Sequence, residues 1–286
     1  MNKNFNRLFQ AALEIEAEEA KKAGALGYMA RTLVQATMPH KKSNTNEFIR
    51  KNGALTLSIL APSNIGLPYG VIPRLLMAWV TTDAVRTKCR TLSLGDSLSG
   101  FMEELGLVPT GGRWGTITRL KDQIRRLFSS SISCSYTDNL HESEVGFRIA
   151  DCHDLWWEPK CPDQYSLFES TVTLSAAFYQ EVIFRPVPID VRVLKVLSRS
   201  PLAIDIYCWL TYRMSYLNKK IQIPWETLQI QFGSDYASNL QGTRDFKRAF
   251  LRELKKVELL YEGTNLEVNG RYLELLPSKP HIKKVN

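Results

Sequence analysis

The chain has 286 residues, of which 44% are hydrophobic and 10% aromatic, so it holds enough apolar side chains for about two packed domains. This composition excludes a disordered chain, a collagen and a small disulfide-rich scaffold. Lys and Arg outnumber Asp and Glu by 37 to 29, and the net charge of +8 favours a polyanionic partner without identifying it. Because the sequence has neither an apolar run near the roughly 20 residues of a membrane helix nor a secretory signal, we expect a cytoplasmic protein without a membrane partner.

Five cysteines are scattered along the chain, and we expect reduced thiols rather than a disulfide framework. Cys152, His153 and Cys161 could supply three ligands to zinc, but they lack the paired Cys-x-x-Cys spacing of a strong zinc motif. We therefore predict no metal site and no cofactor.

The first 38 residues show one amphipathic pattern, which predicts a single helical extension with an acidic stretch at residues 14–19. Gly24 and Gly27 weaken the second half of this helix. The polar, basic run at residues 39–46 has two interpretations. Its composition favours a flexible linker, and the alternative is an arm that follows a nucleic-acid backbone.

Two segments, one around Trp79 and one around Trp209, repeat the same pattern in register. Each tryptophan lies in a predicted helix, and twelve residues later an alternating segment predicts a strand, at residues 91–94 and 221–224. A short helix follows and ends at a glycine in both copies, Gly106 and Gly233.

A basic amphipathic helix is predicted next in each copy, over about residues 116–128 and 243–259. The apolar faces of the two helices comprise Ile117, Leu120, Ile124, Leu127 and Phe128, and Phe246, Ala249, Phe250, Leu254 and Val257. A strand pair follows each helix, predicted at residues 131–136 and 145–150 in the first copy and at 266–268 and 271–275 in the second. The dipeptide Asn269-Gly270 between the last two strands is a strong hairpin signal.

Helix, strand, helix, turn, basic helix and hairpin is the order of a winged helix, a helix-turn-helix unit with a β-hairpin wing. The sequence therefore predicts an α+β protein with two tandem winged-helix domains. We expect an amino-terminal helical extension at residues 1–38, a first winged-helix domain at 39–170 and a second at 171–286. A single charged helix face is best explained as a solvated surface, but two copies in register favour binding of double-stranded DNA.

Arginine can donate two parallel hydrogen bonds to a guanine edge, and lysine neutralises phosphate as a point charge. The predicted DNA contacts in the first copy are Arg113, Thr116, Arg119, Lys121, Arg125 and Arg126. Those in the second copy are Arg244, Lys247 and Arg248 for base edges and adjacent phosphates, Arg252, Lys255 and Lys256 for the backbone, and Arg271 at the wing. A basic tail with Lys279, His281, Lys283 and Lys284 could follow phosphates or serve solubility.

Enzymatic interpretations fit the residues less well. The glycine-rich run at 111–116 lacks the Gly-Lys-Ser/Thr ending of a phosphate-binding loop. Tyr212 and Tyr216 match the paired tyrosines of nicking initiators, but the chain contains no His-x-His pair to hold the metal that this chemistry needs. Core packing is the favoured interpretation of these tyrosines, and we expect a protein that is not an enzyme.

Several stretches resemble the plasmid-encoded RepA replication initiators, at residues 39–42, 55–58, 66–70, 95–99, 106–115, 154–157 and 205–213. The resemblance extends from about Pro39 to the carboxyl terminus. It implies an initiator without enzymatic activity that binds repeated sites, called iterons, in a plasmid origin with both winged helices and helps to melt an adjacent A+T-rich segment. It also implies recruitment of the host initiator and replicative helicase, and a homodimer, formed through the first winged helix, that represses its own gene. Two alternatives are a transcriptional repressor that uses the same surface and a nicking initiator that uses Tyr212 or Tyr216.

Overall fold

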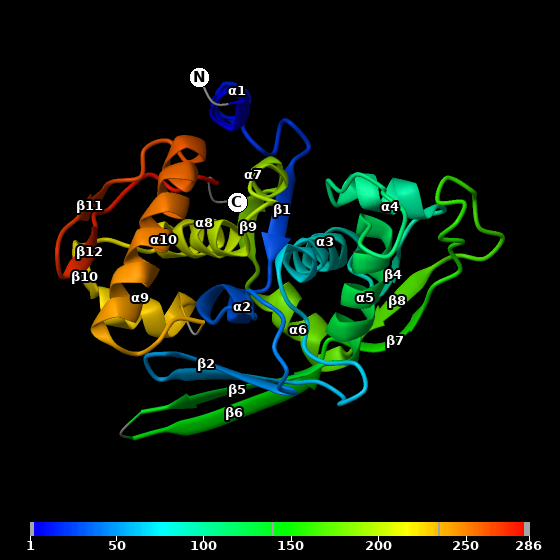
Figure 1. Cartoon of the computed structure of the whole chain (residues 1–286), viewed down its shortest axis with the longest axis horizontal. Helices are drawn as coiled ribbons and strands as arrows, with labels where there is room; N and C mark the ends of the chain where they lie inside the picture. The colour runs from blue at the N-terminus through cyan, green and yellow to red at the C-terminus, as the bar shows by residue number, and fades with distance from the viewer. Residues whose placement is uncertain (1–2, 139, 234, 283–286) are drawn as a thin grey trace.

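The order helix, strand, helix, helix, strand, strand occurs twice in the computed structural model, which describes residues 3–138, 140–233 and 235–282 (Figure 1). The mixture of helices and strands agrees with the predicted α+β class. The first copy comprises α3 (Val71–Thr87), β4 (Thr91–Ser93), α4 (Leu98–Glu104), α5 (Thr116–Ser129), β7 (Ala150–Asp154) and β8 (Thr171–Leu174). The second comprises α8 (Pro201–Met214), β10 (Ile221–Pro224), α9 (Trp225–Phe232), α10 (Leu240–Leu260), β11 (Leu266–Val268) and β12 (Tyr272–Leu275).

In the second copy the last strand lies in the middle of the sheet, because β12 pairs antiparallel with both β10 and β11. Aromatic rings fill the core beneath it, and Phe250 of α10 contacts Trp225 and Phe232 of α9 edge to face. The elements predicted for this copy are confirmed. The helix α10 begins at Leu240, earlier than predicted, because the side chain of Asn239 accepts a hydrogen bond from the backbone of Gly242 and caps the helix.

The sheet of the first copy has the same strand order, with β8 between β4 and β7. The hairpin predicted for this position, at residues 131–136 and 145–150, was assigned wrongly. Its strands are β5 (Ser131–Thr137) and β6 (Glu142–Arg148), and they pair with each other, but β5 then pairs with β3 (Leu55–Leu60) and not with β4. The hairpin that does complete the sheet of the first copy is β7–β8.

A separate four-stranded sheet has the order β2-β3-β5-β6, with β2 at Glu47–Asn52. It is antiparallel throughout, and Leu57 and Ile59 of β3 are fully buried against the helices. Because β2 contacts α9 of the second copy, this sheet extends beneath both copies (Figure 1). The run after Pro39 was predicted as a linker or an arm, but it leads directly into β2, and Pro39 itself is buried.

The amino-terminal segment is not one helix, as the amphipathic pattern predicted. It comprises α1 (Lys3–Ala17), β1 (Leu26–Met29) and the short α2 (Arg31–Gln35). Strand β1 pairs antiparallel with β9 (Val187–Asp190), and α1 packs against α10 and α7 (Val191–Val196). At Gly27 a Cβ atom would lie only 2.5 Å from the side chain of Val191, so glycine permits this close approach.

Two segment boundaries predicted from the sequence separate strands that pair with each other. A boundary at residue 170 separates β8 from β4 and β7, its partners in the first sheet. A boundary at residue 38 separates β1 from its pairing partner, β9. Between the two copies, α6 (Ala176–Phe184), β9 and α7 lead from β8 to α8.

A buried ion pair joins the helices that begin the two copies. Arg74 of α3 donates from Nε to Asp205 Oδ1 and from Nη2 to Asp205 Oδ2 of α8, both at 2.7 Å. The remaining Arg74 hydrogens are bonded to the carbonyl oxygens of Met38, Pro39 and Gly70. The guanidinium therefore holds together α3, α8 and the chain segment before β2.

Two further basic side chains lie near Asp205. His40 donates from Nε2 to Asp205 Oδ2 at 2.7 Å, and burial lowers the pKa of His40, so the ring is neutral at pH 7. Burial also lowers the pKa of Arg50 to about 10, although the charge of Asp205 opposes this effect. For Asp205 itself, burial raises the pKa, but the charge of Arg74 and the hydrogen bonds from His40 and Arg74 outweigh it and hold the pKa below its usual value.

We expect Asp205→Ala to lower the free energy of unfolding by about 3–5 kcal/mol, because it leaves Arg74 buried without a counterion. The control is Asp151→Ala, which breaks an exposed pair with Arg90 and should cost about 0–1 kcal/mol. Urea denaturation measures the free energy of unfolding of both variants. Since the folded-state pKa of Asp205 is lowered, its contribution is present above the unfolded value of about 3.9 and is lost as the pH falls further. Equal, small losses for the two variants would contradict this account.

Candidate nucleic-acid interface

A stripe of exposed basic side chains runs along the outer face of α10. Its members are three or four residues apart and so share one side of the helix: Arg244, Arg248, Arg252 and Lys255. The opposite face, including Phe246 and Phe250, is buried as predicted. This arrangement leaves the basic side of α10 free to approach a polyanion while the core stays covered.

Two arginines in this stripe pair with acidic neighbours on the same helix. Arg248 is 77% exposed and lies 3.5 Å from the carboxylate of Asp245, one turn earlier. Such an exposed pair is worth about 0–1 kcal/mol, so a phosphate or a base edge can replace the Asp245 carboxylate. Arg252 is also exposed, but it bonds from Nε at 2.9 Å to Glu253, whose carboxylate is buried.

A glycine near the start of each basic helix touches the preceding loop. A Cβ atom at Gly242 would lie 1.8 Å from the carbonyl oxygen of Ala237. At Gly115, which precedes α5, it would lie 2.2 Å from the carbonyl oxygen of Thr110. The two glycines therefore set how closely each helix start approaches its loop, and with it the position of the first basic side chains.

Lys247, which was predicted as a base or phosphate contact, is bonded within the protein. Its ammonium group donates to the carbonyl oxygens of Asn269 at 2.6 Å and Gly270 at 3.2 Å, and it lies 4.6 Å from the ring centroid of Trp225. Trp225 Nε1 donates to the same Asn269 carbonyl oxygen. Lys247 and Trp225 together fix the turn between β11 and β12 against α10, and the exposed Arg271 follows directly in that turn.

The helix α5 presents a smaller basic face. Arg119 and Arg125 are exposed and Lys121 is half-buried. Arg126, predicted as a DNA contact, is instead nearly buried and donates from Nε to Asp122 at 2.7 Å and from Nη1 to the carbonyl oxygen of Leu67 at 3.3 Å. It anchors α5 to the segment before α3.

Thr116 is also occupied within the protein. Its hydroxyl donates to the carbonyl oxygen of Val108 at 2.6 Å and accepts from the backbone N–H of Thr110 at 2.9 Å. These bonds close the loop between α4 and α5. Arg113 and Trp114 stand at the exposed tip of that loop, with the guanidinium 5.1 Å from the indole centroid.

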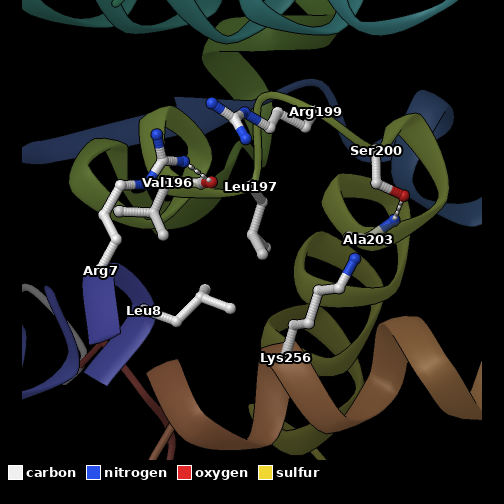
Figure 2. A pocket seen from close by; sticks show the side chains of 8 residues that line it. All are labelled: Arg7, Leu8, Val196, Leu197, Arg199, Ser200, Ala203 and Lys256. Atoms are coloured by element: carbon white, nitrogen blue, oxygen red, sulfur yellow. Dashed lines mark hydrogen bonds between the residues drawn. The ribbon is translucent and has the colours of Figure 1, made fainter. Parts of the chain in front are cut away.

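Lys256 faces the interior side of α10 rather than the basic stripe. It pairs with Glu253 at 2.6 Å and lines a hollow among α1, α7 and α8, together with Arg7 and Arg199 (Figure 2). Burial raises the pKa of Glu253, but hydrogen bonds from Lys256 and Arg252 outweigh it and lower the pKa. The hollow holds about 30 Å³, which is room for about one or two water molecules and too little for a nucleotide.

The carboxyl-terminal segment is packed onto the protein as far as it is described. The Tyr207 hydroxyl bonds to His281 Nδ1 at 2.9 Å, and the His281 backbone N–H donates to the Tyr261 hydroxyl at 2.9 Å. Burial lowers the pKa of His281 to about 4, so this ring is neutral at pH 7 and adds no charge for a phosphate. The predicted tail residues Lys283 and Lys284 lie outside the described residues.

Tyr212 and Tyr216 pack against each other, with ring centroids 5.1 Å apart. Arg213 donates to the Tyr216 hydroxyl at 2.7 Å. Burial and the neighbouring Tyr216 raise the pKa of Tyr212. A raised pKa disfavours the phenolate form, which is the form that attacks a phosphodiester.

All five cysteines are free thiols. In the described part of the chain, no three His, Cys, Asp or Glu side chains gather in a way that could hold a metal ion. Among the described helices, none combines the length and hydropathy needed to cross a bilayer.

Sequence reasoning missed the side chains that position this surface. Trp225 and Asn269 fix the turn between β11 and β12. The guanidinium of Arg126 lies over the Tyr69 ring, 5.6 Å from its centroid. Only the Asn269-Gly270 pair had a local signal, as a turn. The other contacts join residues far apart in the chain, and spacing alone does not reveal them.

Two solved structures are similar to the chain in fold, and both contain domains 2 and 3 of RctB. A selenomethionine derivative has a TM-score of 0.57 and 12% sequence identity, and the match covers 88% of this chain and 99% of that one. A second structure, of residues 155–483, has a TM-score of 0.52 and 12% identity, with 86% and 96% coverage. A search of curated proteins found no match.

The sequence itself matches a protein family described as plasmid encoded RepA protein, over residues 67–227. The match covers more than half of the 286 residues and runs from the segment before α3 into α9, so it includes Arg74 and Asp205 but not α10. The chain belongs to the family of plasmid-encoded RepA proteins.

Proposed function

We propose that this chain is a plasmid replication initiator that binds repeated duplex sites in an origin through two winged helices. One observation carries the proposal: in both copies a sheet with the last strand in the middle follows a helix with exposed basic side chains. This is the order of a helix-turn-helix unit with a wing, whose basic helix enters the major groove. Membership of the plasmid-encoded RepA family supports a role at a plasmid origin.

In this proposal some basic side chains contact base edges and the others contact the DNA backbone. Arg244 and Arg248, at the start of α10, read base edges. The backbone contacts come from side chains further along α10, at the wing turn and in the first copy: Arg252, Lys255, Arg271, Arg113, Arg119, Lys121 and Arg125. Thr116, Arg126 and Lys247 position the two helices, and Lys256 has no part in the interface.

We place the first winged helix from α3 to β8 and the second from α8 to β12, because each of these spans contains its complete sheet. The elements β1, β9, α6 and α7 then join the two units rather than belonging to either. Bound to iterons, the initiator would help to open an A+T-rich segment and recruit the host initiator and replicative helicase. A homodimer would repress its own gene through the same surface.

A gel-shift and footprinting titration against the origin region of its plasmid tests the proposal. It is run at two salt concentrations beside random duplex, since phosphate contacts alone lose affinity steeply with salt. We expect periodic protection over direct repeats and a preference over random DNA that survives the higher salt. Equal loss on both DNAs would contradict sequence-specific origin binding. Protection confined to a promoter, with no need for the protein in plasmid replication, would favour a repressor.

Arg248→Ala should weaken binding to the specific site by about 1–3 kcal/mol and relax its sequence preference, because the proposed contact is to a base edge. The matched control is Arg86→Ala. Arg86 is also 77% exposed and also pairs with an aspartate three residues earlier, Asp83, but it lies on α3, which is not one of the two basic helices. Fluorescence anisotropy with specific and random duplexes measures the difference. An equal loss on both duplexes would make Arg248 a phosphate contact.

We propose that initiation involves no covalent step on this protein. Tyr216→Phe and Tyr212→Phe should each leave plasmid replication unchanged, because neither hydroxyl is assigned to the chemistry and the pKa of Tyr212 is raised. Plasmid copy number in cells is the measurement, with thermal unfolding as a check on folding. Complete loss of replication in a normally folded variant would favour a nicking initiator.

A further inference from the structure

The connection between β7 and β8, residues 155–170, is much longer than the equivalent turn of the second copy, residues 269–271. We refer to it as the aromatic loop. It projects beyond α4 at the edge of the first copy (Figure 1). Loops of this length inside compact domains are usually functional or disordered.

The aromatic loop is held in place by specific contacts. Trp157 is buried and stacks on Phe101 of α4, with the ring centroids 5.2 Å apart. The backbone N–H of Ser99 donates to the carbonyl oxygen of Pro162 at 3.0 Å. The backbone N–H of Ser166 donates to the carbonyl oxygen of Asp96 at 2.9 Å. The start of α4 therefore supports the loop at two points.

On this anchored frame four large apolar side chains face solvent. Trp156 is 54% exposed, Tyr165 75%, Leu167 97% and Phe168 61%. Trp156 and Phe168 contact each other, with ring centroids 4.9 Å apart. A fixed loop that exposes several large apolar side chains is typical of an interaction site. In a protein without a partner, folding would favour the burial of these side chains away from water.

The charge around these side chains identifies the class of partner. Within the loop Glu158, Asp163 and Glu169 oppose the single cation Lys160, although the whole chain carries +8. Carboxylates repel the phosphates of a nucleic acid, so stacked bases do not fit the loop. They complement a protein surface whose apolar cleft is bordered by lysine or arginine.

We propose that the aromatic loop docks a host replication protein that presents an apolar cleft rimmed by basic side chains. This inference rests on the proposed function, since it assigns a partner-binding surface to an initiator already bound at the origin. DNA binding through α5 and α10 and partner binding through the loop then use surfaces of opposite charge. The Leu167 and Tyr165 side chains enter the cleft, and the carboxylates meet its basic rim.

The test compares two triple variants of the full chain. The loop variant carries Tyr165→Ser, Leu167→Ser and Phe168→Ser. The control carries Leu13→Ser, Leu140→Ser and Phe184→Ser, which also remove exposed apolar side chains but lie on separate elements. We expect both to keep the wild-type melting temperature and to bind origin DNA within twofold of wild type, while only the loop variant loses plasmid maintenance, by tenfold or more. If the loop variant does not fold, Leu167→Ser alone replaces it.

A photo-crosslinking amino acid at position 165 identifies what the loop contacts in cells that maintain the plasmid. We expect a crosslink to a host replication protein that is lost when Glu158→Lys and Asp163→Lys reverse the charge. No protein crosslink, a crosslink to DNA or to a second copy of this chain, or a crosslink that survives charge reversal would overturn the proposal. Normal plasmid maintenance by the loop variant would also overturn it, whereas failure of the wild-type chain to bind origin DNA would refute the proposed function itself.

Discussion

The buried ion pair between Arg74 and Asp205 is the constraint on which the relation between the two copies depends. It joins α3 to α8, the first helix of each copy, and Arg74 also binds the carbonyl oxygens that precede β2. Removing both charges from water costs several kcal/mol per ion, so such a pair contributes a defined geometry more than net stability. Because α5 and α10 pack on these helices, the pair also sets the relative orientation of the two basic faces.

The two copies share one architecture but present different surfaces. In the second, a turn of three residues is fixed to α10 through Lys247 and Trp225, which produces a compact basic surface. In the first, the equivalent turn is the aromatic loop, which is acidic and apolar. The inserted strands β5 and β6 extend a further sheet beneath both copies. The two copies share a frame of helices and differ in their connections, and this difference separates the proposed DNA-binding surface from the proposed partner-binding surface.

Much of the fold followed from local patterns, and the failures have physical causes. The helices α5 and α10 and the strand β10 were predictable because burial imposes a period on their apolar residues. Strand pairing was not predictable, because alternating apolar residues indicate a strand but not the strand it pairs with. For this reason β5 and β6 were assigned to the wrong sheet. The amino-terminal helix was extended too far because Gly24 and Gly27 were treated as weak helical positions, whereas Gly27 permits a strand to pass close to Val191.

The sequence predicted which helices carry the basic side chains of the candidate site, but not which of these side chains bond within the protein. Spacing placed Arg126 and Lys247 on the basic faces, yet each meets carbonyl oxygens from a distant segment, Leu67 in one case and Asn269 in the other. Asp205 and its partners Arg74 and His40 carried no local signal, since well over a hundred residues separate them in the chain.

The central claim is that both basic helices contact the same duplex. Hydroxyl-radical footprinting of one origin repeat tests it most directly, with Arg119→Ala/Arg125→Ala altering α5 and Arg244→Ala/Arg248→Ala altering α10. The account predicts that each double variant loses protection over a different segment of the repeat while the other segment stays protected. An unchanged footprint for either variant, or loss of the same segment in both, would contradict it.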